Sequence, residues 1–362
     1  MSPSIIKAIW QRTRAAVEGR SADVVLKSDG GGWILDQFSG QIQRHIEPGT
    51  RVYVTSVPVS GLRNRVIHFV GSECFYDPMW ATKRPHASNA MIGTWWHGSE
   101  SSPEPSIQTA ASRIARVSQH LAAIHVTCGV SRDIVLRLGV PESKIALVPM
   151  GIDLDLFRPP PSEAVRHIAR RELGIPDDAF VIGSFQKDGV GWGDGNEPKL
   201  IKGPDLFARV LASLAERHRV LALIPGPSRG YLKNALHAAR VPFRWDGFVP
   251  FRELTPYYHA CDLYLMTGRE EGGPAMVLEA LATGTPLVAH RSGMAPDVLV
   301  DGVNGFLVDV GDVAAMTTRA EQLATQPELR QRVAAAGLET AQAYAWPQVG
   351  AQYERLYRGV KA

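Results

Sequence analysis

Two carboxylates flank a glycine pair in this chain, and their spacing could do chemistry. Glu271 and Glu279 stand eight positions apart, and Gly272, Gly273 and Pro274 follow the first of them. Pro274 suits the first position of a helix, so the glycines would bare N–H groups at a helix N-terminus, which attracts anions. Ionised carboxylates accept hydrogen bonds from hydroxyls. The pattern therefore predicts a site for a phosphorylated, polyhydroxylated ligand such as a nucleotide sugar.

Two lysines precede this segment. Lys187 follows a strand-like run, and Lys202 stands directly before Gly203 and Pro204 at a predicted helix start. A cation is unfavourable at the positive end of a helix dipole unless an anion joins it. Lys202 therefore favours a ligand role. The alternative for the whole pattern is a capped amphipathic helix with exposed glutamates and solvated lysines.

The elements that must position these residues alternate along the chain. Short apolar runs, typical of buried parallel strands, alternate with helical patterns on both sides of a proline-rich break at 158–161. This predicts an α/β protein with two doubly wound domains, 1–157 and 158–345, facing each other across a cleft. A helix at 346–362 is expected to cross back to the first domain. The expected strands are 23–28, 51–57, 66–71, 124–129, 144–150, 180–186, 220–226, 243–249, 263–268 and 286–291; the expected helices include 33–46, 106–123, 203–218, 252–262 and 274–284.

The composition limits the class of protein. The chain has 362 residues, 45% apolar and 21% charged, which is typical of a globular protein. The net charge of +3 does not indicate nucleic-acid binding, and three scattered cysteines indicate neither a zinc site nor a disulfide framework. No apolar run is long enough to span a membrane and no secretory signal is evident, so a cytoplasmic location is expected. An amphipathic, basic segment at 5–17 would either lie on a membrane surface or pack on its own domain.

Several ordered segments together resemble the retaining family 4 glycosyltransferases, which have the GT-B fold. EGGPAMVLEALATGTPLVA is similar to the family's E-x7-E signature. The segments 125–157, 180–187, 201–214 and 246–268 are similar to the stretches that surround the signature in that family, and 346–358 resembles its terminal helix. The resemblance is good from about residue 90 onward and weaker before it. Several ordered motifs are much stronger evidence than one.

The resemblance implies a role for each residue of the opening pattern. Glu279 matches the glutamate that binds the ribose hydroxyls. Glu271, with the N–H groups of the glycine pair, matches the contacts to the donor sugar. Lys187 and Lys202 match the basic pair on the diphosphate, where fixed cations would stabilise the leaving group without a metal. Lys187 stands where the family usually has arginine, which removes the bidentate geometry, so the donor's identity stays open.

The first half contributes weaker candidates. His97, before Gly98 in MIGTWWHG, matches a histidine that meets the donor sugar in the family; a structural histidine is the alternative. Gly30, Gly31 and Gly32 follow a predicted strand, and their N–H groups could approach a phosphate or the acceptor. A simple structural turn is nearly as good an explanation of this cluster.

Two further features lie near the predicted boundary between the domains and after the predicted strand at 180–186. Asp153 and Asp155 form a D-x-D pair in the expected interdomain link, and we interpret them as structural. The glycine-rich segment 188–201 is longer than the family's usual connection and carries Trp192. It is expected to fold over the donor or the acceptor.

The predicted function is transfer of a sugar from a nucleotide-diphosphate sugar to an acceptor hydroxyl with retention of configuration. We expect no cofactor and no essential metal. The expected partners are a nucleotide-sugar donor and a saccharide or lipid-linked acceptor, in surface polysaccharide or glycoconjugate synthesis, with a peripheral membrane contact. The alternatives are a non-catalytic sugar-nucleotide-binding subunit, or a glycoside phosphorylase or epimerase of the same architecture.

Overall fold

The computed structural model describes residues 18–19, 21–31 and 34–361, and the chain forms two compact units. One unit contains the residues up to Gly151 together with those from Trp346, and the other runs from Ile152 to Ala345. We predicted the boundary between 157 and 158, six residues later. It falls earlier because the Ile152 N–H already donates to the Tyr344 carbonyl at 2.9 Å, inside the second unit. The segment predicted at 5–17 lies outside the described residues.

Six parallel strands form the sheet of the first unit in the order β2-β1-β3-β4-β5-β6. The strands β3 and β5 are buried along their whole length, including a histidine in each, His68 and His125. The order reverses between β1 and β3, which is the switch point of this doubly wound sheet. The strands are β1 Val24–Lys27, β2 Val52–Thr55, β3 Val66–Phe69, β4 Ala90–Thr94, β5 Ala123–Val126 and β6 Ile145–Leu147.

Helices flank this sheet, and one prediction for them is wrong. The expected single helix at 106–123 is two helices, because the Arg113 N–H donates three residues back to Ala110 and tightens the chain at that point. The helices are α2 Ile34–His45, α3 Glu73–Tyr76, α4 Trp80–Lys83, α5 Pro105–Ala111, α6 Ile114–Ser118, α7 Gly129–Arg137 and α16 Trp346–Lys361.

The second unit repeats the architecture with its own core. Its parallel strands have the order β12-β11-β10-β7-β8-β9, so the switch point lies between β7 and β10. The sequence analysis missed β12, which is only three residues long, and predicted β9 five residues too long. The strands are β7 Phe180–Gly183, β8 Val220–Leu223, β9 Phe243–Arg244, β10 Leu263–Met266, β11 Leu287–His290 and β12 Phe306–Val308.

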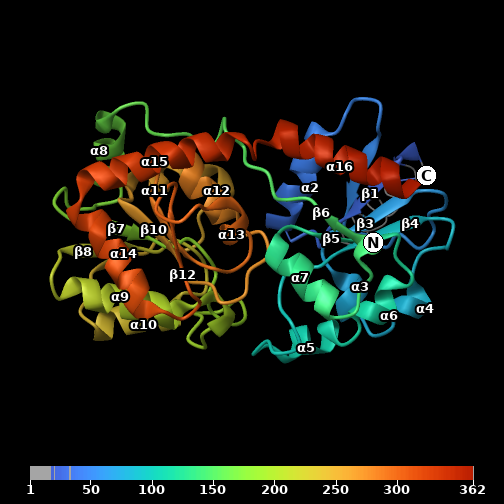
Figure 1. Cartoon of the computed structure of the whole chain (residues 1–362), viewed down its shortest axis with the longest axis horizontal. Coiled ribbons are helices and arrows are strands. Elements are labelled where there is room, and N and C mark those ends of the chain that lie inside the picture. The colour runs from blue at the N-terminus through green and yellow to red at the C-terminus, as the bar shows by residue number, and fades with distance from the viewer. Residues whose placement is uncertain (1–17, 20, 32–33, 362) are drawn as a thin grey trace, which may run out of the picture. The chain divides into compact units, whose positions relative to one another are not determined.

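The helices of the second unit cover both faces of its sheet, and α9 packs beside α14 (Figure 1). A continuous set of buried aliphatic side chains from α9, α14 and the central strands forms the core. No helix among the described residues could cross a bilayer. The helices are α8 Glu163–Glu172, α9 Pro204–Ala215, α10 Gly230–Ala238, α11 Thr255–Ala260, α12 Ala275–Ala282, α13 Ala295–Val298, α14 Val313–Thr325 and α15 Pro327–Gln342.

The helix α16 belongs to the first unit, where it lies beside α2 (Figure 1). A buried polar chain ties it to the sheet. Tyr357 lies 2.9 Å from His68 Nδ1, Thr94 Oγ1 lies 2.7 Å from His68 Nε2 and 3.1 Å from His125 Nδ1, and Tyr353 lies 3.0 Å from His125 Nε2. All donors are satisfied if both histidines are neutral, and burial lowers the pKa of each, that of His125 to about 4.

Candidate active site

Lys187, Lys202 and Glu271 lie at the carboxyl edge of the second sheet. Lys187 follows β7, and Glu271 follows β10, so both leave carboxyl ends of the two strands that meet at the switch point. Ligands of open α/β sheets bind in the crevice at such a point. The position is therefore the one where this architecture places a ligand.

Glu271 and Lys202 form the centre of this region. Lys202 Nζ donates to Glu271 Oε2 at 2.7 Å. Glu271 is only 6% exposed, and its Oε1 is buried without a hydrogen-bond partner among the described residues. An ionised carboxylate of this kind retains the capacity to accept further hydrogen bonds. Lys202 partly offsets the cost of burying the charge, and the remaining acceptor oxygen is suited to a ligand hydroxyl.

Close backbone contacts hold this pair in place. Gly203 has φ +66°, and a Cβ there would lie 2.0 Å from the Thr267 carbonyl, so only glycine lets α9 approach the end of β10. Arg269 fastens the loop after β10, because its guanidinium donates two hydrogen bonds of 2.8 and 2.7 Å to the Asp205 carboxylate on α9. The sequence analysis did not identify Arg269, whose role depends on this tertiary contact.

Glu279 lies in α12, as predicted, and it is buried with 5% of its surface exposed. The Tyr258 hydroxyl donates to its Oε2 at 2.6 Å. Burial raises the pKa of the Glu279 carboxyl to about 7, and the Tyr258 hydrogen bond opposes this shift. The group therefore changes protonation near neutral pH. The sequence did not indicate Tyr258 as its partner.

The glycine pair lies at the start of α12, but the proline is displaced from its predicted position. Pro274 is the N-cap, with ψ 102°, and Ala275 is the first helical residue. Proline fits this extended position because it has a fixed φ and no N–H to satisfy. The N–H groups of Gly272 and Gly273 donate to no other residue in the described part of the chain. They remain available donors at the positive end of the helix.

Lys187 does not contact the Lys202–Glu271 pair through any hydrogen bond in the described residues. Its ammonium donates to the Gly189 carbonyl at 3.1 Å and lies 4.6 Å from the ring centroid of Trp192. Burial lowers the pKa of Lys187. The Trp192 ring is 63% exposed, so the insertion presents an aromatic face beside the lysine.

The insertion is fastened to its own domain. The Gly230 N–H donates to the Asp194 carbonyl at 2.7 Å, and the Tyr231 N–H donates to Gly195 at 2.8 Å. The Ser228 hydroxyl lies 2.9 Å from the Gly193 carbonyl. The segment thus packs on the connection between β8 and α10. Whether it also covers a ligand stays a prediction.

Sequence reasoning missed Arg229, which organises the end of β7. This side chain is 0% exposed, and its Nη1 donates to the carbonyls of Ser184 at 2.9 Å and Gln186 at 2.6 Å. Its Nε lies 3.2 Å from Asp188 Oδ1, forming a fully buried ion pair. Arg229 thereby fixes the backbone on both sides of Phe185, directly before Lys187. The local sequence holds no signal for a buried arginine.

The first unit holds the remaining candidates at the carboxyl edge of its own sheet. His97 follows β4 and is partly buried, next to Gly98 with φ +91°. Gly30 follows β1 with φ +74°, and the Gly31 N–H donates to Asp29 Oδ1 at 3.2 Å. Gly32 lies outside the described residues. The switch point of this sheet lies beside β1, where Gly30 and Gly31 are found.

The D-x-D pair closes a turn. Asp153 Oδ1 accepts hydrogen bonds from the N–H groups of Asp155 at 3.2 Å and Leu156 at 3.1 Å. This contact is consistent with the structural interpretation. In the part of the chain that the structure describes, no three His, Cys, Asp or Glu side chains are grouped closely enough to hold a metal ion.

Comparison with known proteins identifies relatives. The family model described as "Glycosyl transferases group 1" matches residues 198–340. A D-inositol 3-phosphate glycosyltransferase of Xylanimonas cellulosilytica is 32% identical over 238 residues, which are 63% of this chain and 54% of that protein. One of Streptomyces scabiei is 27% identical over 298 residues, 77% of this chain and 63% of that protein. The chain spans between about half and two thirds of the length of these curated relatives.

Solved structures share the fold across both units. The crystal structure of Anabaena Alr3699/HepE in complex with UDP and glucose has a TM-score of 0.73 at 16% identity, covering 93% of this chain and 99% of that one. Sucrose-phosphate synthase from Thermosynechococcus elongatus has a TM-score of 0.70 at 17% identity, covering 94% and 96%. The predicted GT-B fold class, two doubly wound domains, is confirmed, and residues 198–340 match the group 1 glycosyltransferase model.

Proposed function

We propose that this protein is a retaining glycosyltransferase that moves a sugar from a nucleotide-diphosphate sugar to an acceptor hydroxyl. The Lys202–Glu271 pair carries this proposal, because a buried carboxylate with an open acceptor oxygen stands beside an ammonium at the switch point. The carboxylate oxygen suits a sugar hydroxyl, and the ammonium suits a diphosphate. UDP is the first donor base to test, since the similar Anabaena protein was crystallised with UDP-glucose.

The reaction breaks the bond between the anomeric carbon and the diphosphate oxygen. A new bond forms from the acceptor oxygen to the same face of that carbon. The acceptor proton passes to the departing phosphate oxygen, so the nucleoside diphosphate leaves with the proton and no separate base is needed. Lys202, the glycine N–H groups and Lys187 would stabilise the charge on the leaving group. Glu279 would hold the ribose and His97 would meet the donor sugar, as the family resemblance implies.

The proposal includes independence from metals and cofactors. The cations of Lys187 and Lys202 would supply the positive charge that a divalent ion supplies elsewhere. Activity should therefore be unchanged in EDTA.

The acceptor side of the proposal rests on the relatives' names and on the sequence. The relatives are named D-inositol 3-phosphate glycosyltransferases, and this name leads us to propose a saccharide or polyol hydroxyl as the acceptor for this protein. Surface polysaccharide or glycoconjugate synthesis in the cytoplasm, with lipid-linked acceptors, is the context we propose. Contact with the membrane would involve segment 5–17, and sedimentation with anionic vesicles tests it. Glycosylation of a soluble metabolite only, with no use of lipid-linked or oligosaccharide acceptors, would contradict this context.

Thermal unfolding with a panel of nucleotide sugars tests donor binding. A donor at 100 times its dissociation constant should stabilise the protein by about 2.7 kcal/mol. Lys202→Ala and Glu279→Gln should remove this shift. Lys233→Ala is the control, because Lys233 of α10 packs over the Trp245 ring and is not among the residues of the proposed site.

Turnover separates the proposal from its alternatives. Retaining sugar transfer predicts that product forms only when an acceptor is present. The product should keep the α- or β-configuration of the donor sugar. Product formed without an acceptor indicates an epimerase, and dependence on inorganic phosphate indicates a phosphorylase. Donor binding with no turnover for any acceptor would favour the non-catalytic binding subunit.

A further inference from the structure

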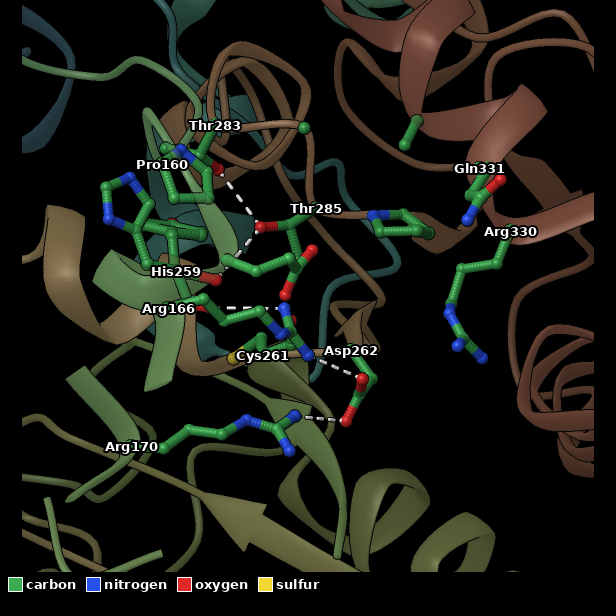
Figure 2. A pocket seen from close by; sticks show the side chains of 15 residues that line it. Pro160, Arg166, Arg170, His259, Cys261, Asp262, Thr283, Thr285, Arg330 and Gln331 are labelled. Carbon is green, nitrogen blue, oxygen red and sulfur yellow. Dashed lines mark hydrogen bonds and ion pairs between the residues drawn. The ribbon is translucent and has the colours of Figure 1, made fainter. Parts of the chain in front are cut away.

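A pocket opens at the opposite edge of the second sheet from the Lys202–Glu271 pair. It has a volume of about 380 Å³ and is lined by α8, α15, the end of α11 and the turn between α12 and β11 (Figure 2). Asp262 stands directly before β10, and Pro286 stands directly before β11. Both belong to the amino edge of this parallel sheet, whereas Glu271 follows β10 at the carboxyl edge. The pocket therefore lies at the other edge of the sheet from Lys202 and Glu271, and Tyr258, which lines it, also donates to Glu279.

One wall of the pocket holds a compensated cluster of charges. Arg166 Nη2 and Arg170 Nη2 each lie 2.6 Å from a different oxygen of Asp262. Arg166 Nη1 also donates to the carbonyl of Cys261 at 2.8 Å. Two guanidinium groups thus share one carboxylate, and the cluster keeps one positive charge.

The other wall holds a guanidinium with no carboxylate. Arg330 of α15 donates from Nη1 to the Leu323 carbonyl at 2.8 Å and packs 5.7 Å from the ring centroid of Phe180. Among the described residues, no carboxylate lies within 4.0 Å of the Arg330 guanidinium. Figure 2 shows Arg330 and Gln331 across the pocket from Asp262 and Thr285. With Glu163 exposed at the rim, three cations and two anions line the pocket, so positive charge is in excess.

The floor between these walls is hydroxylic. Thr283 Oγ1 donates to the carbonyls of Glu279 and Ala280, and Thr285 Oγ1 donates to the Tyr258 carbonyl at 3.1 Å. The two hydroxyl oxygens lie 3.1 Å apart. Both side chains line the pocket with 2% and 4% of their surface exposed, and a hydroxyl oxygen that donates its proton keeps lone pairs that can accept a hydrogen bond from a ligand's hydroxyl group. Such a floor suits a sugar or polyol better than an apolar group.

We propose that this pocket binds a small phosphomonoester of a sugar or polyol. Arginine presents a planar fork that matches two phosphate oxygens, and Arg330 offers such a fork without a competing carboxylate. The threonine floor and the Gln331 amide would receive the hydroxyl-bearing part. The volume lies in the range of small-ligand pockets. The binding site does not depend on the proposed function.

Isothermal titration with glucose 6-phosphate tests the proposal on the full chain, with and without saturating UDP. Inorganic phosphate and glucose are the partial probes, and each should bind more weakly than glucose 6-phosphate. Arg330→Ala should weaken binding by about tenfold or more, as expected when a charge-assisted hydrogen bond is lost. The control is Arg332→Ala, because Arg332 is an exposed arginine of the same helix outside the pocket. It should bind within about twofold of the wild type.

A second variant guards against a folding defect, because Arg330→Ala also removes the bond to Leu323. Gln331→Glu adds a negative charge at the exposed mouth of the pocket and keeps every contact of Arg330. It should weaken glucose 6-phosphate binding about as much as Arg330→Ala does, because the new carboxylate repels the phosphate. Three results would each overturn the proposal: no binding up to about 10 mM, which corresponds to an affinity too weak to be specific; unchanged binding in both variants; or displacement by UDP. Equal affinity for inorganic phosphate would overturn the assignment to a sugar ester.

Discussion

Glu271 carries its charge almost out of contact with water, and only one of its oxygens has a cation. Its partner Lys202 is more exposed, with 20% of the side chain accessible against 5% for the glutamate. Most of the desolvation cost therefore falls on the carboxylate. The pair can therefore bind a ligand that carries both an anion and a hydroxyl. A nucleotide-diphosphate sugar would supply an anion for Lys202 and a hydroxyl for the Glu271 oxygen that has no partner.

Lys202→Met should destabilise the free protein, because it leaves the Glu271 carboxylate buried without a cation. We expect a loss of about 2–3 kcal/mol in the free energy of unfolding. The double variant with Glu271→Gln should recover a large part of this loss, since no buried charge remains. Urea unfolding of both single variants and the double variant measures the coupling. Strictly additive effects would mean that the two side chains do not interact.

Glu279 should make donor binding depend on pH near neutrality. Its pKa of about 7 means that a proton must leave before the carboxylate can accept from ribose hydroxyls in its ionised form. The affinity for a nucleotide sugar should therefore rise about tenfold between pH 6 and pH 8. Titration calorimetry with UDP-glucose measures this rise. The diphosphate of UDP-glucose stays fully ionised from pH 6 to pH 8, so the ligand's own charge does not change. Glu279→Gln should bind weakly with no such slope.

The same group gives the opposite trend in stability, which provides a check. Because folding raises the pKa of Glu279 above its usual 4.5, the folded state binds more protons than the unfolded state between about pH 4.5 and pH 7. The contribution of Glu279 to stability is therefore greatest below pH 4.5 and is lost as the pH rises to 7. A pH-independent difference between wild type and Glu279→Gln would contradict the assigned pKa.

At this scale, the residue types and their spacing were enough to place Glu271 and Lys202 in one region, and their side chains are in contact; that Glu279 serves the same ligand stays a prediction. The partners Tyr258, Arg229 and Arg269 could not be predicted, because each reaches its contact from another element of the sheet. Pro274 was misplaced by one position, since proline suits both the N-cap and the first helical turn.

At the scale of elements, the insertion between β7 and α9 depends on glycine geometry. Gly195 has φ +73°, and a Cβ there would lie 2.1 Å from the Ser228 carbonyl. Gly191 has a similar φ of +71°, but a Cβ there would meet no atom within 4 Å. The same substitution at the two positions therefore distinguishes the cost of backbone strain, which both share, from the cost of a steric clash, which only Gly195 has.

Gly195→Ala should detach the insertion, whereas Gly191→Ala should leave it in place. Both variants carry the cost of a left-handed conformation, about 1–2 kcal/mol, but only Gly195→Ala adds the clash with Ser228. Limited proteolysis within 188–198 should accelerate several-fold in Gly195→Ala alone. Equal cleavage rates in the two variants would show that the Ser228 contact does not hold the insertion.

The elements themselves were predicted where burial leaves a plain sequence pattern. The central strands are continuous apolar runs because both faces are covered. The break between α5 and α6 and the short β12 were not predicted, since each depends on one or two residues within an otherwise regular pattern.

At the scale of the whole molecule, the chain builds two separate apolar cores. Each sheet, with its helices, buries its own set of side chains. The polar chain through Thr94 is part of the first unit only, where it connects β3, β4 and β5 to α16. A change in that chain should therefore act on one unit.

Thr94→Val should loosen the first unit and leave the second unit protected. Valine keeps the shape of threonine but leaves nitrogens of His68 and His125 without partners, at a cost of about 2–4 kcal/mol. Hydrogen exchange should accelerate in β3, β5 and α16 and stay unchanged in β7 and β10. Thr318→Val is the control, because Thr318 is exposed and bonds only within α14. Faster exchange in both units would show that they unfold together.

The return of α16 to the first unit has a consequence for the order of synthesis. Residues 152–345 form the second unit, and they emerge from the ribosome before the helix that completes the first. At about 5–20 residues per second, this interval lasts on the order of ten to forty seconds. During that time, His68, Thr94 and His125 lack the two tyrosines that cover them. The first unit to begin is thus the last to close, and a chaperone that shields this face during translation would raise the yield of folded protein.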